Sequence, residues 1–399
     1  MKLLVFSTLF PNRIEPHHGV FVKTRLERYL SRHGGSAAIV APVPLAPPVG
    51  PRRWTRYRRI ASEETVEGLA VEHPRFLSPP GFGDGWRASL MARGVKRSLL
   101  EHVKRTQPDV LDVHYAYPDG VAAWQLRDEL SRALGRRLPM VLTCRGTDLN
   151  LIPQIDSVRP QLETMLKSVD HVICVADALR EVALDLGAPA GRVTTLRNGV
   201  DLERFHPGSQ QEARKQVGLP GDGKVVLCVG HLVERKGQHL LIEAFARAFG
   251  SSAEPHRLVL VGGGDVVPLA QLARRHGVEH LIQFVGPVAP EALPLWYRAA
   301  DVQVLASSRE GWPNVVLEGL ACGTPIIATK VWGTPEILRD CTAGKLVEPT
   351  VEGLVRGLSD MNQLDAGAAR LWADRFGWDP TLDGMHDVFE RVVAEAVSA

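Results

Sequence analysis

Apolar runs alternate with amphipathic segments along this chain of 399 residues. Runs in which nearly every residue is apolar indicate strands that are buried on both faces. In the first half of the chain we predict such strands at 3–6, 37–40, 110–113, 140–143, 171–175 and 193–196. Between them, apolar residues at helical spacing predict helices at 21–33, 88–105 and 120–133. Strands joined by helical crossovers predict a parallel sheet with helices on both faces.

The same alternation starts again in the second half of the chain. Strands are predicted at 225–229, 258–261, 283–285, 302–305 and 326–328. The turn signal Asn198-Gly199 opens a polar stretch between the two series. We therefore predict an α/β fold with two doubly wound domains, residues 1–205 and 206–378, followed by an amphipathic helix over 379–399.

Composition excludes several classes of protein. A chain with 45% hydrophobic and 23% charged residues is an ordinary globular protein, and a net charge of +2 gives no reason to expect a nucleic-acid partner. The sequence has no signal-peptide layout and no apolar run near the ~20 residues that span a bilayer. The five cysteines are far apart and form no Cys-x-x-Cys pair, so we expect core thiols in a reducing compartment. These features predict a cytoplasmic protein, with any membrane contact peripheral.

The most informative motif is Glu310-Gly-Trp-Pro-Asn-Val-Val-Leu-Glu318. Pro313 is predicted to be the first residue of a helix, which leaves the N–H groups of Asn314 and Val315 free to bind an anion. Glu310 precedes the helix and Glu318 lies about a turn and a half inside it. An anion site beside two carboxylates fits the phosphates and hydroxyls of a sugar nucleotide. The alternative is a surface helix with an acidic first turn.

A second motif follows the strand predicted at 225–229. Arg235 and Lys236 lie in a short loop before a helix, where two cations beside a helix N-terminus suit a diphosphate. A solvated pair of cations is the alternative. After the first strand, Gly19 allows backbone to approach a ligand closely.

Polar residues also follow the strands of the first half. His114 follows the strand at 110–113, and Arg145 and Asp148 follow the strand at 140–143. Each is compatible with a structural role, but their gathering at strand carboxyl ends predicts a shared site. The proline-rich loops at 42–51 and 78–87 are either ligand contacts or simple connectors.

The sequence gives little support for a nicotinamide cofactor or for a metal ion. The glycines at 262–264 lack the full dinucleotide spacing because position 267 is valine, which disfavours a nicotinamide cofactor and a nucleotide-dependent oxidoreductase. No Asp-x-Asp and no cluster with metal-ligand spacing occurs in the sequence, so we expect no metal.

Together these motifs resemble the retaining glycosyltransferases of family 4, which have the GT-B fold. The 310–318 motif, Arg235-Lys236-Gly237 and the stretch beginning Asn198-Gly-Val-Asp201 occur in the family's order and spacing. The resemblance implies two Rossmann-like domains facing across a cleft, with the acceptor bound by the first and the donor by the second. It also implies that the last helix crosses back to the first domain. The string that begins at Arg145 resembles members that build teichuronic acid and other exopolysaccharides.

The resemblance implies roles for the second-domain residues. Arg235 and Lys236 hold the donor diphosphate and stabilise it as it leaves, where charge grows in the transition state. Glu318 accepts the ribose hydroxyls and Glu310 contacts the donor sugar. The base pocket is expected to be backbone near Val288.

In the first domain the resemblance implies that Gly19 lets backbone reach the phosphate and that His114 contacts the transferred sugar.

Three positions depart from the family pattern. His231 stands where arginine is common, Trp332 replaces a glycine, and Arg145 replaces a histidine. His231 removes a permanent cation from the donor site, and Trp332 is expected to narrow the sugar pocket.

The segment Arg52-Arg-Trp-Thr-Arg-Tyr-Arg-Arg59 admits two interpretations. Arginines beside tryptophan and tyrosine suit an anionic membrane surface, which would bring a lipid-linked acceptor within reach. The other interpretation is a solvated basic loop.

The sequence thus predicts a retaining glycosyltransferase that uses a UDP or GDP sugar, with no metal or other cofactor. The acceptor would be a glycan or a lipid-linked sugar of the cell envelope. A GT-B sugar-nucleotide epimerase and a non-catalytic module that binds a sugar nucleotide or glycan are the alternatives. The motifs leave the base, the sugar and the acceptor open.

Overall fold

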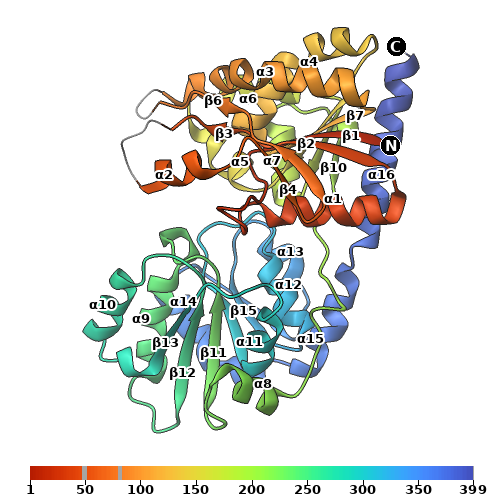
Figure 1. The fold of residues 1–399 in the computed structure, drawn as a ribbon. Coiled ribbons are helices and arrows are strands. Elements are labelled where there is room, and N and C mark those ends of the chain that lie inside the picture. Colours follow the sequence, from red (N-terminus) through yellow and green to blue (C-terminus); the bar gives the residue numbers. More distant parts are fainter. Residues whose placement is uncertain (47–51, 80–82, 399) are drawn as a thin grey trace. The chain divides into compact units, whose positions relative to one another are not determined.

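The computed structural model describes residues 1–46, 52–79 and 83–398, so parts of the proline-rich loops predicted at 42–51 and 78–87 lie outside the described residues. The chain divides into two compact units (Figure 1). The first comprises Met1–Arg197 with Pro380–Ala399, and the second comprises Asn198–Asp379. The chain changes unit at the Asn198-Gly199 turn, ahead of the boundary predicted at 205.

The first unit is built on a mainly parallel sheet with the strand order β10-β9-β8-β7-β1-β2-β5-β4. The six predicted strands are β1 (Lys2–Phe6), β2 (Ser36–Val40), β7 (Val110–His114), β8 (Met140–Cys144), β9 (His171–Cys174) and β10 (Val193–Thr195). They pair in parallel. The chain adds β2 on one side of β1 and later returns to add β7 on the other. The carboxyl ends of β1 and β7 therefore form a switch point, where open α/β sheets bind ligands.

The edge of this sheet is a hairpin that we did not predict. β4 (Glu63–Val66) and β5 (Leu69–Glu72) pair antiparallel, and β5 pairs with β2. Glu67 and Gly68 both have positive φ, as a two-residue type I′ turn requires. Val71 is the one buried residue of the two strands, so the sequence carries no continuous apolar run to reveal them.

The three predicted helices of the first unit are confirmed. They are α1 (Val20–His33), α3 (Arg87–Thr106) and α4 (Val121–Leu134), and the unit also contains α6 (Arg159–Leu166), α7 (Asp177–Asp185) and the short ribbon β3 (Val43–Pro44) with β6 (Arg75–Phe76). The basic segment, for which a solvated loop was one of two interpretations, forms the helix α2 (Arg52–Arg59).

The last helix, α16 (Asp379–Ser398), packs against the first unit and lies beside α1 (Figure 1). Arg25 Nε lies 2.7 Å from Met385 Sδ, and the ring of Phe389 meets Tyr29 edge-on with 5.4 Å between centroids. Arg25, Tyr29 and Phe389 are all inaccessible to solvent. The apolar face predicted for residues 379–399 is therefore part of the first unit's core.

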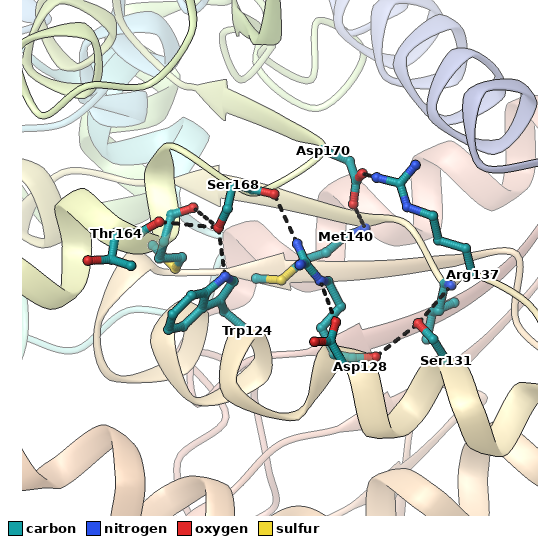
Figure 2. A network of polar contacts seen from close by, with 11 residues as sticks. Trp124, Asp128, Ser131, Arg137, Met140, Thr164, Ser168 and Asp170 are labelled. Atoms are coloured by element: carbon teal, nitrogen blue, oxygen red, sulfur yellow. Dashed lines mark hydrogen bonds and ion pairs between the residues drawn. The ribbon is translucent and has the colours of Figure 1, made fainter. Parts of the chain in front are cut away.

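Polar contacts fix α4 to the segment between α6 and β9 (Figure 2). Trp124 Nε1 donates to Ser168 Oγ over 2.7 Å, and Arg127 donates to the Ser168 carbonyl over 2.9 Å. Asp170 accepts from the backbone N–H of Met140 over 2.8 Å. These contacts fix the start of β8, whose carboxyl end leads to Arg145.

The second unit is built on a parallel sheet with the strand order β13-β12-β11-β14-β15-β16. The predicted strands are β11 (Lys224–Val229), β12 (His256–Val261), β13 (Ile282–Gly286), β14 (Val302–Leu305) and β15 (Ile326–Thr329). The sequence did not predict β16 (Gly344–Val347), three of whose four residues are only half-buried. The switch point of this sheet lies between the carboxyl ends of β11 and β14.

Helices cover this sheet on both faces. They are α8 (Gln210–Val217), α9 (Gln238–Phe249), α10 (Val267–Arg275), α11 (Leu293–Ala299), α12 (Asn314–Ala321), α13 (Thr334–Leu338), α14 (Val351–Ser359) and α15 (Ala366–Ala373). Leu241 and Phe245 of α9 belong to the core together with Leu354 of α14.

All five cysteines are buried and unpaired, as expected for core thiols. Among the described residues, no helix combines the length and apolar character needed to cross a bilayer.

Candidate active site

At the carboxyl edge of the second unit's sheet, the loop that contains Arg235 and Lys236 lies next to the loop that contains Glu310. The loop after β11 contains the 3-10 turn Glu234–Lys236 and ends at Gly237, which has φ 69°. A Cβ atom at Gly237 would lie 2.0 Å from the carbonyl oxygen of Ala306, so only glycine allows this loop to pack on the end of β14. The N–H of Ser308 also donates to the Arg235 carbonyl over 2.8 Å. The sequence thus holds both loops at the switch point.

Lys236 and Glu310 form a direct ion pair at this edge. Lys236 Nζ lies 2.5 Å from Glu310 Oε1, and Ser307 Oγ donates to the same oxygen over 2.6 Å. The side chains are 14% and 9% exposed, so the pair is largely shielded from water. Arg235 is exposed beside it. Residues 74 positions apart, predicted from separate motifs, are therefore neighbours.

The helix after Glu310 starts one residue later than predicted. Pro313 is the N-cap of α12, with a non-helical ψ of 87°, so the prediction that it is the first helical residue is wrong. The first turn still begins with Asn314 and Val315. Asn198 donates to Asn314 Oδ1 over 3.4 Å, and Trp312 Nε1 donates to the Asn198 carbonyl over 2.9 Å. The linker residue Asn198 therefore positions the start of α12, a role that sequence reasoning missed.

Glu318 is held by a tyrosine from the neighbouring helix α11. Tyr297 donates from its hydroxyl to Glu318 Oε2 over 2.7 Å, and Tyr297 is completely buried. Burial raises the pKa of Glu318, and the Tyr297 hydrogen bond acts in the opposite direction. The signal for Tyr297 in the sequence was weak, because a buried tyrosine needs some partner but the sequence does not say which.

His231 and the loop after β13 lie on either side of Gly263. A Cβ atom at Gly263 would lie 3.9 Å from Pro287 Cβ and 4.0 Å from His231 Nδ1. His231 is exposed, and Val288, one residue after Pro287, is half-buried. The structure therefore brings His231 close to the loop proposed for the base.

Trp332 departs from ordinary backbone geometry. It follows β15 with φ 46°, in the left-handed region that a non-glycine residue adopts at a cost of roughly 1–2 kcal/mol. This is the position where the resemblance implies glycine. The substitution places a large half-buried ring at the carboxyl edge of the sheet.

In the first unit, the predicted residues form a buried charged cluster. Arg145 Nη2 lies 2.8 Å from His114 Nδ1, and His114 Nε2 lies 3.2 Å from Asp112 Oδ2. His114 and Asp112 are each 1% exposed. Burial lowers the pKa of His114, although Asp112 opposes it. Burial also opposes ionisation of Asp112, but His114, Arg25 and Arg145 outweigh it and hold the pKa of Asp112 below its usual value.

The side chain of Asp148 binds backbone N–H groups of two chain segments. Its carboxylate accepts from the N–H groups of Arg145 at 3.0 Å, Gly146 at 2.7 Å and Ala116 at 3.0 Å. It is fully buried at the start of α5 (Thr147–Asn150). These contacts join the chain segments that follow β7 and β8, and the substrate contact predicted for Asp148 stays a prediction.

Gly19 is required by local packing. It precedes α1 with φ 68°, and a Cβ atom there would lie 2.2 Å from the carbonyl carbon of Leu9. Only glycine allows this approach. Contact of Gly19 with phosphate remains a prediction.

Two family models together match most of the chain. The model described as Glycosyltransferase Family 4 matches residues 22–204, and the model described as Glycosyl transferases group 1 matches residues 209–370. D-inositol 3-phosphate glycosyltransferase of Geodermatophilus obscurus is 31% identical over 312 residues, which are 73% of this chain and 68% of that protein. The chain belongs to glycosyltransferase family 4.

Other relatives of this family 4 glycosyltransferase cover different shares of its length. "Putative teichuronic acid biosynthesis glycosyltransferase TuaC" of Bacillus subtilis is 29% identical over 345 residues, 84% of this chain and 83% of that one. D-inositol 3-phosphate glycosyltransferase 2 of Catenulispora acidiphila is 36% identical over 262 residues, but only 61% of its length is covered.

Solved structures confirm the predicted fold class. Sucrose-phosphate synthase from Thermosynechococcus elongatus has a TM-score of 0.78 at 21% identity, with 99% of each chain covered. Anabaena HepE in complex with UDP and glucose has a TM-score of 0.70 at 19% identity, with 98% of this chain and all of that one covered. The family 4 glycosyltransferase therefore has the α/β GT-B fold with Rossmann-like domains, and the comparisons favour neither the epimerase nor the non-catalytic module.

Proposed function

We propose that this glycosyltransferase transfers a hexosyl group, with retention of anomeric configuration, from a UDP or GDP sugar and without a metal or other cofactor. The Lys236–Glu310 pair at the switch point of the second sheet is the observation that carries the proposal. It places a cation and a carboxylate beside the start of α12, where the first-turn N–H groups of Asn314 and Val315 suit a phosphate. Anabaena HepE, which has a similar fold, was solved in complex with UDP and glucose, and this supports the choice of donor class.

The pair gives each residue a distinct task in the reaction. The bond between the anomeric carbon and the diphosphate oxygen breaks, and a bond to the acceptor oxygen forms on the same face of the sugar. The acceptor proton passes to the leaving phosphate. Lys236 and Arg235 stabilise the charge that grows on that phosphate. When Lys236 turns to the phosphate, Glu310 is released to accept from a sugar hydroxyl.

Other residues orient the donor. Oε2 of Glu318 is taken by Tyr297, which leaves Oε1 for the ribose hydroxyls. His231 and the backbone near Val288 would flank the nucleotide. In the first unit, Gly19 would approach the phosphate, while His114 and Arg145 would act on the transferred sugar through the rigid cluster that holds them.

The acceptor is proposed to be a glycan or a lipid-linked sugar of an envelope polysaccharide. The name of TuaC, which refers to teichuronic acid, supports that class. The basic helix α2 supports a peripheral location at the inner face of the cytoplasmic membrane, because arginines favour an anionic leaflet.

Thermal unfolding against a panel of nucleoside diphosphates and their sugars tests the donor assignment, with NAD(P) as the control. A ligand at about 100 times its Kd stabilises the protein by about 2.7 kcal/mol. A shift with one nucleoside diphosphate and its sugar supports the proposal and names the base. A shift with NAD(P) alone overturns it. Transfer that survives excess EDTA supports metal independence, and transfer that EDTA abolishes refutes it.

A further inference from the structure

The first unit contains a cavity of about 720 Å³ whose walls differ in chemistry. The polar wall comes from the loop between β1 and α1 and includes Asn12, Glu15 and His18. The apolar wall comes from the β3–β6 ribbon and includes Val43, Pro44 and Phe76. A cavity of this volume accommodates a ligand of several sugar or lipid units. The contrast between the two walls suits a ligand that is polar on one side and apolar on the other.

Large apolar side chains are exposed on the segments that line this cavity. Leu45 is 53% exposed, Leu77 is 54% exposed and Trp86 is 67% exposed. Seven large apolar residues are exposed within the part of the chain that the structure describes, and three of them lie here. Leu45 lines the cavity, while Leu77 and Trp86 directly follow or precede the lining residues Phe76 and Arg87. Grouped exposed apolar residues mark an interaction surface rather than ordinary surface scatter.

The same region carries a concentration of positive charge. Arg56, Arg58 and Arg59 of α2 are exposed, and α2 contains no acidic residue. Tyr57 of this helix lines the cavity, and its carbonyl accepts from Arg75 Nη1 over 2.7 Å. That hydrogen bond holds α2 against the ribbon that forms the apolar wall. Exposed apolar groups and arginines therefore occur together beside one cavity.

We propose that this cavity binds the sugar-bearing head of an acceptor lipid that stays in an anionic leaflet, with Leu45, Leu77 and Trp86 entering the leaflet. The proposal rests on the transfer function above and specifies its acceptor as a membrane lipid. Arginines complement the anionic headgroups, and leucine and tryptophan favour the boundary between headgroups and hydrocarbon. A small free sugar phosphate would use the cations but would leave the three apolar side chains without a role.

Vesicle binding by the full chain tests the docking surface. The vesicles contain phosphatidylcholine with about a third phosphatidylglycerol, or phosphatidylcholine alone, and each arginine near an anionic surface is expected to contribute roughly fivefold to binding. The rim variant Leu45→Ser/Leu77→Ser/Trp86→Ser is compared with the matched variant Val267→Ser/Leu371→Ser. Val267 and Leu371 are 61% and 73% exposed but lie in the second unit.

We expect co-sedimentation of the wild type with the anionic vesicles, a loss of at least about tenfold in the rim variant, and wild-type binding in the matched variant. The variant Arg56→Gln/Arg58→Gln/Arg59→Gln should also bind less, and the remaining binding should depend less on salt. Equal binding by the rim and matched variants, or no binding by the wild type at low salt, overturns the proposal.

A separate variant tests the polar wall. Glu15→Gln should raise the apparent KM for a vesicle-borne acceptor without weakening vesicle binding, because Glu15 Oε1 lies 3.8 Å from Arg56 Nη1 and its loss only frees a cation of the docking surface. An unchanged KM overturns the assignment of the acceptor head to this cavity. Thermal shifts with nucleoside diphosphates are measured for every variant. If the nucleoside diphosphates still shift the melting temperature but the wild type does not bind vesicles, only this inference is overturned. If the nucleoside diphosphates do not shift the melting temperature of the wild type, the proposed function is overturned.

Discussion

Tyr297 donates its hydroxyl proton to Oε2 of Glu318 over 2.7 Å, so a completely buried side chain fixes the orientation of the carboxylate proposed to bind ribose. The two residues lie on adjacent helices, α11 and α12. The contact makes donor binding depend on a residue that need not touch the donor. A hydrogen bond of this kind contributes about 1 kcal/mol to stability, and more where one partner is charged.

Tyr297→Phe removes that hydrogen bond while retaining the ring. Because burial raises the pKa of Glu318 and the tyrosine opposes the rise, the variant should have a still higher pKa at Glu318. Binding of a nucleoside-diphosphate sugar should therefore weaken at low pH, and the acid limb of its pH profile should move upward. Titration calorimetry over a pH series measures this. An unmoved acid limb would show that Tyr297 serves packing only.

Removing one partner of the Lys236–Glu310 ion pair should lower both the stability of the protein and its turnover. Lys236→Met leaves a shielded carboxylate without its cation, which should destabilise the protein by about 3 kcal/mol. The double variant Lys236→Met/Glu310→Gln should regain most of that stability but remain inactive. Urea unfolding and turnover are measured on the same samples. A double variant as unstable as the single one, or a single variant with near-normal turnover, would contradict the assignment.

His231→Arg should tighten binding of a nucleoside diphosphate by about threefold to tenfold, because it supplies a permanent cation beside the loop proposed for the base. His276→Arg is the matched control, since His276 is also exposed but follows α10 at the opposite edge of the same sheet. Fluorescence or calorimetric titration gives both affinities. Equal tightening in the two variants would mean a general charge effect.

His171 should make the first unit sensitive to acid. Its Nδ1 lies 3.0 Å from Arg391 of α16, a contact that requires a neutral imidazole. Burial, with Arg391 second, lowers the pKa of His171 to about 4 from 6.5. The unfolded chain therefore binds more protons between these values, so stability should be retained above pH 6.5 and fall as the pH falls toward 4.

His171→Gln removes this titrating group. The melting temperature of the variant should fall less than that of the wild type between about pH 7 and about pH 5. His276→Gln, at a solvent-exposed position, should keep the wild-type slope. Parallel slopes in all three proteins would exclude His171 as the source of acid sensitivity.

The parts of the fold that the sequence predicts are those with a local signature. Every predicted strand exists, because buried parallel strands are continuous apolar runs. The hairpin β4–β5 was missed because its residues are mostly half-exposed and its turn depends on positive φ at Glu67 and Gly68. β16 was missed because half-burial removes the apolar run that would have marked it.

The sequence predicts some of the candidate site residues, but it does not show the contacts that join them. Lys236 and Glu310 belong to motifs with strong local patterns, although the ion pair that joins them exists only in the folded chain. Asn198 and Tyr297 act through single long-range hydrogen bonds, which leave no local pattern. The sequence also did not reveal that Asp148, predicted to contact the substrate, accepts backbone N–H groups from two chain segments, because such contacts leave no local pattern either.

The position of α16 has a consequence for biosynthesis. The first unit includes Pro380–Ala399, and these residues follow the whole of the second unit along the chain. When residues 1–197 have left the ribosome, they therefore still lack α16, the helix that buries Tyr29 and Arg25. Domains usually complete folding in order from the N-terminus. Here the second unit can finish first, and the nascent first unit keeps the surface of α1 that receives α16 uncovered until the last helix has been synthesised.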